Sequence, residues 1–243
     1  MKISVITISY NSSTTIKQTL KSVQKQSHPH IEHIIVDGKS TDNTLQICNE
    51  FNHISKIISE PDRGVYDAFN KGLKLASGEI IGFLNSDDVF YDKHSLKKIS
   101  EKFDEQTDCV FANLDYVNQR GKVVRKWRSK SYQKDAFFKG WMPAHPTFYC
   151  RKSIYDQLGG YDDSFDIAGD FELMLRFFEK NNIRSKFIDQ TLVKMMTGGI
   201  SNSGIASKVK IIKEENRAFQ QNKISLSFFK YIFNKVLKIK EFF

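Results

Sequence analysis

Two adjacent carboxylates follow a short apolar run in the stretch "EIIGFLNSDDVFYD", residues 79–92. The run ends on Asn85 and Ser86, and Asp87 and Asp88 come directly after them. Like charges side by side at a buried strand end are costly unless a positive group neutralises them. Mg²⁺ and Mn²⁺ bind one or two carboxylates and complete their shells with water and substrate phosphates. The pattern therefore indicates a divalent-metal or ribose site, with a plain turn after a strand as the alternative.

Polar residues also end two earlier apolar runs, at 3–9 and 31–37. They are Thr7, Ser9, Tyr10 and Asn11 in the first case and Asp37 and Gly38 in the second. In open α/β sheets, ligands bind beyond the carboxyl ends of the strands. We therefore expect these residues to converge in space with the carboxylates of 85–88. A simple turn at Asp37, and hydroxyls that only satisfy strand-end backbone groups, are the alternatives.

The elements that would position these residues alternate through the first 90 residues. Strands are expected at 3–9, 31–37, 54–59 and 79–84. Helical spacing lies between them, as where Ile16, Leu20 and Val23 follow one another at i, i+4 and i+7. This alternation at intervals of about 25 residues predicts βαβ units and a mostly parallel sheet. Ser40 or Thr41 is the expected N-cap of the second helix.

The pattern changes after residue 96. We expect two strands within 109–127 around a turn at 119–121, and a further strand at 145–150. A helix at 167–181 and two short strands at 185–189 and 191–196 are expected to follow. No Pro- or Ser-rich linker interrupts the chain. We predict one α/β domain over residues 1–203, followed by a basic amphipathic helical tail over residues 204–243.

Composition narrows the class of protein. The chain has 243 residues, of which 40% are hydrophobic and 27% charged, as in ordinary globular proteins. Its three cysteines are too few and too widely spaced for a disulfide framework or a zinc site, which predicts reduced thiols and a cytoplasmic chain. The net charge is +9, and residues 205–243 hold nine Lys or Arg against three Glu. The body therefore carries little excess charge, and nucleic-acid binding is not expected.

Four blocks of the sequence, in order, resemble the signatures of the family 2 glycosyltransferases. They read "ISVITISYN", "IIVDGKSTDNT", "EPDRGVYDAFNKGLKLASGEIIGFLNSDD" and "AGDFELMLRF", and the resemblance covers about residues 2–200. It implies the GT-A fold of nucleotide-diphospho-sugar transferases, a Rossmann-like, mostly parallel sheet flanked by helices. The helical tail would follow this domain.

The resemblance also implies a donor site. Its nucleotide-binding residues would be Thr7, Ser9, Tyr10, Asp37, Asp67, Lys71, Asn85 and Ser86. Asp37 would accept a hydrogen bond from a base N–H, which suits uracil or thymine. Asn85 stands where the metal-binding motif usually has its first acid, whose partner is a ribose hydroxyl. Asp87 would bind the metal, Asp88 would support it, and the loop 197–201 would close over the diphosphate.

The same resemblance implies that Asp170 is the catalytic base. Gly169 stands before it, where many members carry a glutamate. Glu172 and His145 are the residues expected on the acceptor side. An N-cap role for Asp170 stays open, and the two flanking prolines of His145 favour a structural histidine.

These residues imply an inverting, metal-dependent glycosyltransferase that uses Mn²⁺ or Mg²⁺. It would move one sugar from a UDP- or dTDP-sugar to a hydroxyl of a glycan or a polyprenyl-diphosphate-linked acceptor, in the synthesis of a bacterial surface polysaccharide. A degenerate member that binds a nucleotide without turnover is the alternative. A nucleotidyltransferase would usually carry a Gly-rich phosphate loop after the first strand, and "ISYNSSTT" has none.

The segment 223–243 has a helical pattern with a broad apolar face opposite lysines. One interpretation is a helix that packs on the body or on a partner subunit. The interpretation we prefer is a helix in the interface of an anionic membrane, close to a lipid-linked acceptor. This predicts a protein held peripherally at the cytoplasmic face of the inner membrane. No stretch reaches 18 uninterrupted apolar residues, so a transmembrane helix is not expected.

Overall fold

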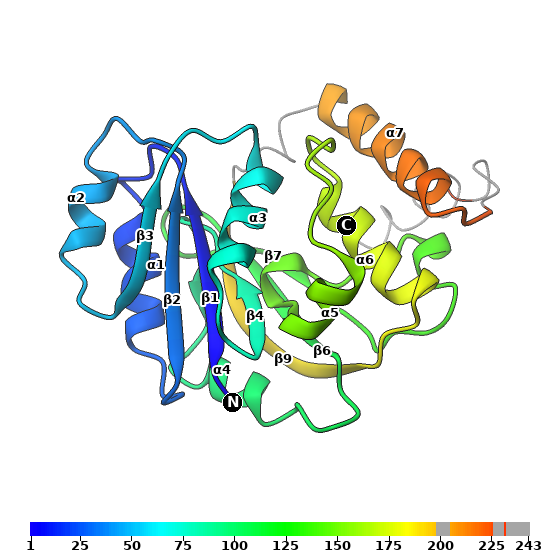
Figure 1. Cartoon of the computed structure of the whole chain (residues 1–243), viewed down its shortest axis with the longest axis horizontal. Helices are drawn as coiled ribbons and strands as arrows, with labels where there is room; N and C mark the ends of the chain where they lie inside the picture. The colour runs from blue at the N-terminus through cyan, green and yellow to red at the C-terminus, as the bar shows by residue number, and fades with distance from the viewer. Residues whose placement is uncertain (198–204, 226–230, 232–243) are drawn as a thin grey trace.

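The β-branched runs of the N-terminal half form four parallel strands in the computed structural model, which describes residues 1–197, 205–225 and 231 (Figure 1). They are β1 (Ile3–Ser9), β2 (Ile31–Asp37), β3 (Ile54–Ser59) and β4 (Ile80–Phe83), and they pair in the order β3-β2-β1-β4. The connecting helices are α1 (Ile16–Gln24), α2 (Thr44–Asn49) and α3 (Val65–Leu75). The predicted spacing is confirmed in α1, because Ile16, Leu20 and Val23 are its buried apolar side chains.

The second half continues the same sheet. Strand β8 (Tyr149–Arg151) pairs antiparallel with both β4 and β6 (Cys109–Val117). Because β8 is antiparallel to both of its neighbours, β6 runs in the same direction as β4. Strand β9 (Ser185–Met196) in turn runs parallel to β6. The short β5 (Val89–Phe90) pairs antiparallel with β9, and β7 (Val123–Trp127) pairs antiparallel with β6. The mostly parallel sheet is therefore confirmed, and the carboxyl ends of β1, β2, β3, β4, β6 and β9 share one edge.

Several local predictions were wrong. Residues 185–196 form one strand rather than two. Its pairing with β6 continues past Asp189 and Gln190, because the register shifts there, between Ala112 and Asn113 of β6. Half of the expected strand at 145–150 is a 3₁₀ turn, η2 (His145–Thr147), before β8. The expected helix at 167–181 is confirmed as α6 (Gly169–Leu175), which continues into a π-helical turn, η3 (Arg176–Lys180). Helix α2 has Asn43 at its N-cap instead of Ser40 or Thr41.

Two elements outside the predicted pattern complete the sheet's surroundings. Helix α4 (Ser95–Ser100) follows β5, and α5 (Lys152–Leu158) follows β8. The 3₁₀ turn η1 (Phe137–Lys139) precedes η2. Apolar clusters pack on both faces of the sheet, so β6 is buried along its whole length.

Helix α7 (Ile205–Gln221) lies beside α6 (Figure 1) and buries Ala218 and Phe219 against the body. The first part of the predicted tail is therefore packed on the catalytic body. The predicted membrane helix at 223–243 lies almost wholly outside the described residues. Within the described part of the chain, no helix is long and apolar enough to cross a membrane.

Candidate active site

Asp37 ends β2 and holds three strands together at the carboxyl edge. Its carboxylate accepts hydrogen bonds from the hydroxyls of Ser9 (3.2 Å) and Ser59 (2.7 Å), at the ends of β1 and β3, and from the backbone N–H of Ser40 (2.8 Å). The hydroxyl of Ser40 is a fourth donor. Asp37 is 0% exposed. Its acceptor positions are used inside the protein, so the expected contact with a nucleotide base is not available to it.

Another carboxylate faces the open side of this edge. A Cβ placed on Gly38 would lie 2.8 Å from Asp62 Oδ2 and 3.4 Å from the Tyr10 ring, so both side chains sit directly over the bare Cα of Gly38. Tyr10 is 65% exposed, as a ring that stacks on a ligand needs to be. Tyr10 and Asp62 therefore lie together beside Gly38, next to the end of β2 where the sequence predicts base recognition by Asp37. The signal for Asp62 was present, because it follows β3 at the same edge.

Lys71 and Asp67 hold Asp62 in place. Lys71 Nζ lies 2.7 Å from Asp62 Oδ1, 3.2 Å from Asp67 Oδ2 and 3.2 Å from Glu60 Oε1. Asp67 also pairs with Arg63 at 3.1 Å. These ion pairs fix the segment 60–67 between β3 and α3. They occupy both residues, so the structure gives Lys71 and Asp67 a supporting position under the expected diphosphate site.

The loop after β4 carries the paired carboxylates. Burial raises the pKa of Asp87, which is partly exposed, and burial together with the charge of Asp87 raises the pKa of Asp88 well above its usual value. The backbone N–H of Met196, at the end of β9, donates to Asp88 Oδ1 at 3.3 Å. Ser86 Oγ lies 2.8 Å from Ser12 Oγ, which ties this loop to the one after β1.

A divalent cation fits this loop. Two buried oxygens, Asn85 Oδ1 and Asp88 Oδ2, have no hydrogen-bond partner in the described structure. Burial raises the pKa values of both adjacent carboxylates, and a bound cation would offset the cost of keeping them ionised there. The described residues contain no cluster of three or more metal-ligating side chains. The residues present therefore suit a cation that draws its remaining ligands from water and a substrate phosphate.

Asp170 lies in the first turn of α6, at the same edge. Burial raises the pKa of its carboxylate to about 6, and the negative charge of Glu215 on α7 acts in the same direction. The backbone N–H of Phe171 donates to Asp170 Oδ1 at 2.8 Å, and the Tyr66 hydroxyl approaches the same oxygen at 3.5 Å. A carboxylate of this pKa can hold or release a proton near neutral pH.

The space next to Asp170 explains Gly169. A Cβ on Gly169 would lie 2.7 Å from the Tyr66 ring, so the aromatic ring occupies the place where a glutamate side chain would begin. Tyr66 also donates to the backbone carbonyl of Ile167 at 2.6 Å. Tyr66 therefore supports Asp170 from the side where many family members carry an acid.

Glu214 supports Asp170 from α7. Its two oxygens accept hydrogen bonds from the backbone N–H groups of Asp166 (3.2 Å), Ile167 (2.9 Å) and Ala168 (2.8 Å). Glu214 is 8% exposed, so these charge-assisted bonds are shielded from water. Helix α7 thus fixes the backbone that leads into Asp170.

Tyr116, near the end of β6, is influenced by both groups of carboxylates. Burial raises the pKa of the Tyr116 phenol, Arg125 lowers it, and the charges of Asp88 and Asp170 both raise it further. A single side chain therefore lies within electrostatic reach of the candidate metal site and the candidate base. These two sites come from parts of the chain more than 80 residues apart.

Three other predicted residues are used inside the protein. Thr7 is 0% exposed and its hydroxyl lies 3.0 Å from His33 Nε2. His145 packs against Phe83 and lies 2.7 Å from the Tyr161 hydroxyl, and burial lowers its pKa to about 4. Glu172 is 4% exposed and paired with Arg176 at 2.9 and 3.0 Å. The structure thus places His145 and Glu172 in the core rather than on an acceptor surface.

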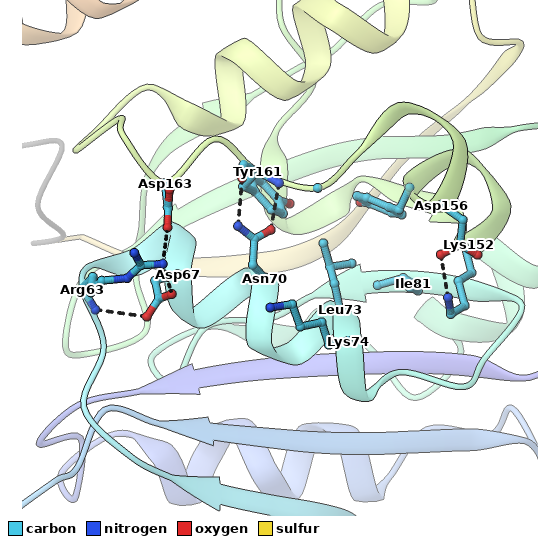
Figure 2. Close-up of a pocket in the computed structure, with 12 residues that line it drawn as sticks. Arg63, Asp67, Asn70, Leu73, Lys74, Ile81, Lys152, Asp156, Tyr161 and Asp163 are labelled. Atoms are coloured by element: carbon cyan, nitrogen blue, oxygen red, sulfur yellow. Dashed lines mark hydrogen bonds and ion pairs between the residues drawn. The ribbon is translucent and has the colours of Figure 1, made fainter.

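A cavity of about 380 Å³ opens elsewhere, between α3 and α5 (Figure 2). Several of its polar side chains pair with one another, since Arg63 pairs with Asp163, Lys152 pairs with Asp156, and Asn70 bonds to the backbone of Tyr161. None of Asp37, Asp87, Asp88 and Asp170 lines it. The cavity adjoins the carboxyl-edge site through Asp67, which lines it and also pairs with Lys71.

The fold and the site together define a class of protein, a nucleotide-sugar transferase of GT-A type. Solved structures share the architecture: S. aureus TarS residues 1–349 in complex with UDP-GlcNAc has a TM-score of 0.70 at 24% identity over 90% of this chain and 70% of that chain. The mannosyltransferase PcManGT from Pyrobaculum calidifontis, in complex with GDP-Man and Mn²⁺, has a TM-score of 0.67 at 16% identity over 92% of this chain and 64% of that chain. In another TarS structure the chain spans 43% of the protein it matches.

Sequence comparison gives the family. The sequence model of Glycosyl transferase family 2 matches residues 4–167, and the chain belongs to this family. A PGL/p-HBAD biosynthesis glycosyltransferase of Mycobacterium tuberculosis is 28% identical over 82% of this chain and 79% of the relative. An uncharacterized glycosyltransferase of the same organism is 32% identical over 72% of this chain and 68% of the relative. The predicted family, fold and glycosyltransferase class are confirmed.

Proposed function

We propose that the chain is an inverting, metal-dependent glycosyltransferase that moves one sugar from a nucleoside-diphosphate sugar to an acceptor hydroxyl. The proposal is supported by the raised pKa values of Asp87, Asp88 and Asp170 and by the effect of both Asp88 and Asp170 on the pKa of Tyr116. A site that binds a diphosphate through a cation and removes a proton a short distance away needs these two kinds of carboxylate.

Asp62 and Tyr10 favour particular donors. Asp62 Oδ1 is paired with Lys71, and Oδ2 lies over Gly38. A carboxylate there accepts a ring N–H, which uracil, thymine and guanine carry and cytosine lacks. UDP- and dTDP-sugars remain our preferred donors, and solved neighbours with bound UDP-GlcNAc and GDP-Man agree with a ring N–H donor.

The proposed reaction is one displacement. Asp170 removes the proton from the acceptor hydroxyl as that oxygen attacks the anomeric carbon, and its pKa of about 6 keeps it ionised at neutral pH. Asp87, with Asp88 and Asn85 beside it, would hold Mn²⁺ or Mg²⁺, and the bound cation would supply the positive charge that offsets the negative charge of the departing diphosphate. Attack from the face opposite the leaving group inverts the anomeric configuration.

The acceptor we propose is a glycan or a polyprenyl-diphosphate-linked glycan in bacterial surface-polysaccharide synthesis. Relatives named for the biosynthesis of PGL and p-HBAD support a role in cell-envelope glycans. Such an acceptor is held by a membrane, so we place the protein peripherally at its cytoplasmic face. The segment 223–243 remains a candidate for that contact.

A donor-turnover screen tests the proposal. UDP-, dTDP-, GDP- and CDP-sugars are each incubated with Mn²⁺, Mg²⁺ or EDTA, and released nucleoside diphosphate is measured. Turnover that needs metal, and that is lost in Asp170→Asn but kept in Asp156→Asn, is the expected result. Asp156 is a matched control because it is an exposed carboxylate, paired with Lys152, on α5. Metal-dependent nucleotide binding without turnover of any donor would instead favour the degenerate, non-catalytic alternative.

A further inference from the structure

The β6–β7 hairpin and the segment after it, residues 118–134, form a basic surface that we call the basic hairpin. It holds no Asp or Glu and seven Lys or Arg, which are Arg120, Lys122, Arg125, Lys126, Arg128, Lys130 and Lys134. All seven are exposed. Outside the hairpin, residues 1–204 contain more Asp and Glu than Lys and Arg. The body is therefore polarised, with its positive charge gathered on one hairpin.

Most of these charges have no partner within the described structure. Arg128 pairs with Asp115 at 2.8 Å, and Arg125 lies over the Tyr116 and Trp127 rings at 5.0 and 5.7 Å. The other five cations form no ion pair with a described residue. Cations gathered without nearby anions repel one another, so an anionic surface that binds them is stabilising.

The beginning of β7, directly after the turn of the hairpin, is also apolar. Val123 is 37% and Val124 is 53% exposed, next to each other in β7 and flanked by Lys122 and Arg125. An adjacent pair of exposed aliphatic side chains between cations is typical of protein surfaces that enter the headgroup region of an anionic bilayer. A soluble polyanion would satisfy the cations but would leave the two valines in water, so the valines favour the bilayer.

The basic hairpin lies next to the candidate site. Val117 pairs with Val123 across the hairpin and with Met196 in β9. The backbone N–H of Met196 donates to Asp88. A surface held by the hairpin would therefore lie at the carboxyl edge, where a lipid-held acceptor would need to approach Asp170.

We propose that the basic hairpin docks the protein on an anionic phospholipid bilayer, with Val123 and Val124 in the headgroup region and the flanking cations on lipid phosphates. The benefit of this docking rests on the proposed function, because it brings the carboxyl edge to a lipid-linked acceptor. The docking itself is measured without donor or acceptor, so its failure and the failure of the glycosyltransferase proposal are distinguishable.

Vesicle sedimentation with the full chain is the first test. The probe is a phosphatidylcholine vesicle containing about 30% phosphatidylglycerol, compared with pure phosphatidylcholine. Arg120→Gln/Lys122→Gln/Lys126→Gln should lower the partition coefficient at least about tenfold, because each lost cation weakens attraction to an anionic surface. The matched control is Lys25→Gln/Lys102→Gln/Lys180→Gln, three exposed lysines that precede β2, β6 and β9 at the opposite edge. It should change binding less than about twofold.

A site-specific label separates the hairpin from the segment 223–243, which stays intact in every variant. Cys48, Cys109 and Cys150 are buried, so an environment-sensitive thiol dye labels a Val124→Cys variant selectively. Anionic vesicles should shift its emission to shorter wavelength, and dye on Lys25→Cys should not respond. Equal vesicle binding by wild type and the hairpin triple, or a silent dye at position 124, would overturn the proposal. Binding of inorganic polyphosphate without binding of vesicles would overturn it in favour of a soluble polyanion.

Discussion

At the residue scale, burial raises the pKa of the Asp170 carboxylate to about 6, which is close to neutral pH. As a base it must be ionised, so kcat/KM should fall about tenfold per pH unit below about pH 6 and level off above it. Asp170→Asn should lower kcat by about 10²- to 10⁴-fold while donor affinity stays unchanged. A pH–rate profile and nucleotide titration of the variant check this. An acid limb that follows ordinary carboxyl titration near pH 4 would remove Asp170 from the role of base.

The same burial makes a stability prediction. The folded state binds the Asp170 proton more tightly than the unfolded state, so ionisation costs stability above about pH 6, and this cost disappears below the unfolded pKa near 4. Asp170→Asn removes the charge and keeps an acceptor for the Phe171 N–H. It should therefore raise stability at pH 8 by about 2 kcal/mol and give no gain at pH 4. Denaturant unfolding at both pH values measures the difference, and an equal effect at both would contradict it.

Substitution of Asp62 should affect donor binding, whereas substitution of Asp37 should affect the stability of the fold. Asp62→Asn changes the carboxylate over Gly38, so it should raise the KM for the donor about tenfold and leave kcat and folding nearly unchanged. Asp37→Asn points an amide N–H₂ at hydroxyl and backbone donors, so it should destabilise the fold by about 1–3 kcal/mol. Donor kinetics and denaturant midpoints of both variants test the assignment. A KM effect confined to Asp37→Asn would restore the sequence prediction.

The sequence predicted which residues follow the strands, and it could not predict which of them reach solvent. Asp37 ends one strand of the parallel sheet and Asp62 follows another, but only packing decides that hydroxyls surround the first and that Lys71 and Gly38 lie beside the second. The resemblance implied an acceptor-side position for His145 and Glu172. The contact of His145 with Tyr161 is a tertiary one that spacing does not reveal, whereas Arg176 stands four residues after Glu172 in the predicted helix, so that ion pair could have been inferred.

At the element scale, α7 is a structural part of the catalytic body. Glu214→Gln replaces a carboxylate that accepts three backbone N–H groups, and the new amide N–H₂ opposes one of them. The loop before Asp170 should loosen, so we expect kcat to fall about tenfold, the donor Kd to hold, and the acid limb of the pH–rate profile to move. Glu101→Gln, an exposed glutamate after α4, is the matched control. An unchanged acid limb with only lower thermal stability would show that Glu214 does not position Asp170.

Strong periodicity made the first four strands and α1 predictable. Short or irregular elements were not, because a three-residue strand such as β8 has no period to detect, and the Asp189–Gln190 pair reads as a turn unless β6 is known to lie beside it. The tail was assigned as one unit because its charge is continuous along the sequence. Only packing shows that α7 belongs with α6.

At the scale of the whole molecule, the topology of the sheet places the ends of its parallel strands, and the candidate site residues that follow them, at one edge. The parallel direction of β1, β2, β3 and β4 was inferable from the alternation of strands and helices, so the edge that they share was predictable. The basic hairpin was missed because net charge was summed over the whole body, where acids elsewhere cancel it. Charge summed over single elements would have found it.

A thermal-shift panel tests the assembled edge in one experiment. A nucleotide at about 100 times its Kd stabilises the folded chain by about 2.7 kcal/mol, which is a rise in Tm of roughly 5–10 °C for a chain of this size. UDP, dTDP or GDP with Mn²⁺ should give this rise, while CDP should not, because cytosine offers Asp62 no ring N–H. EDTA or Asp87→Ala should abolish the shift, because EDTA removes the cation that would join the diphosphate to this loop and the variant removes the carboxylate that would bind that cation. An equal shift with CDP would contradict base recognition by Asp62, and a shift that persists in EDTA would contradict the metal site.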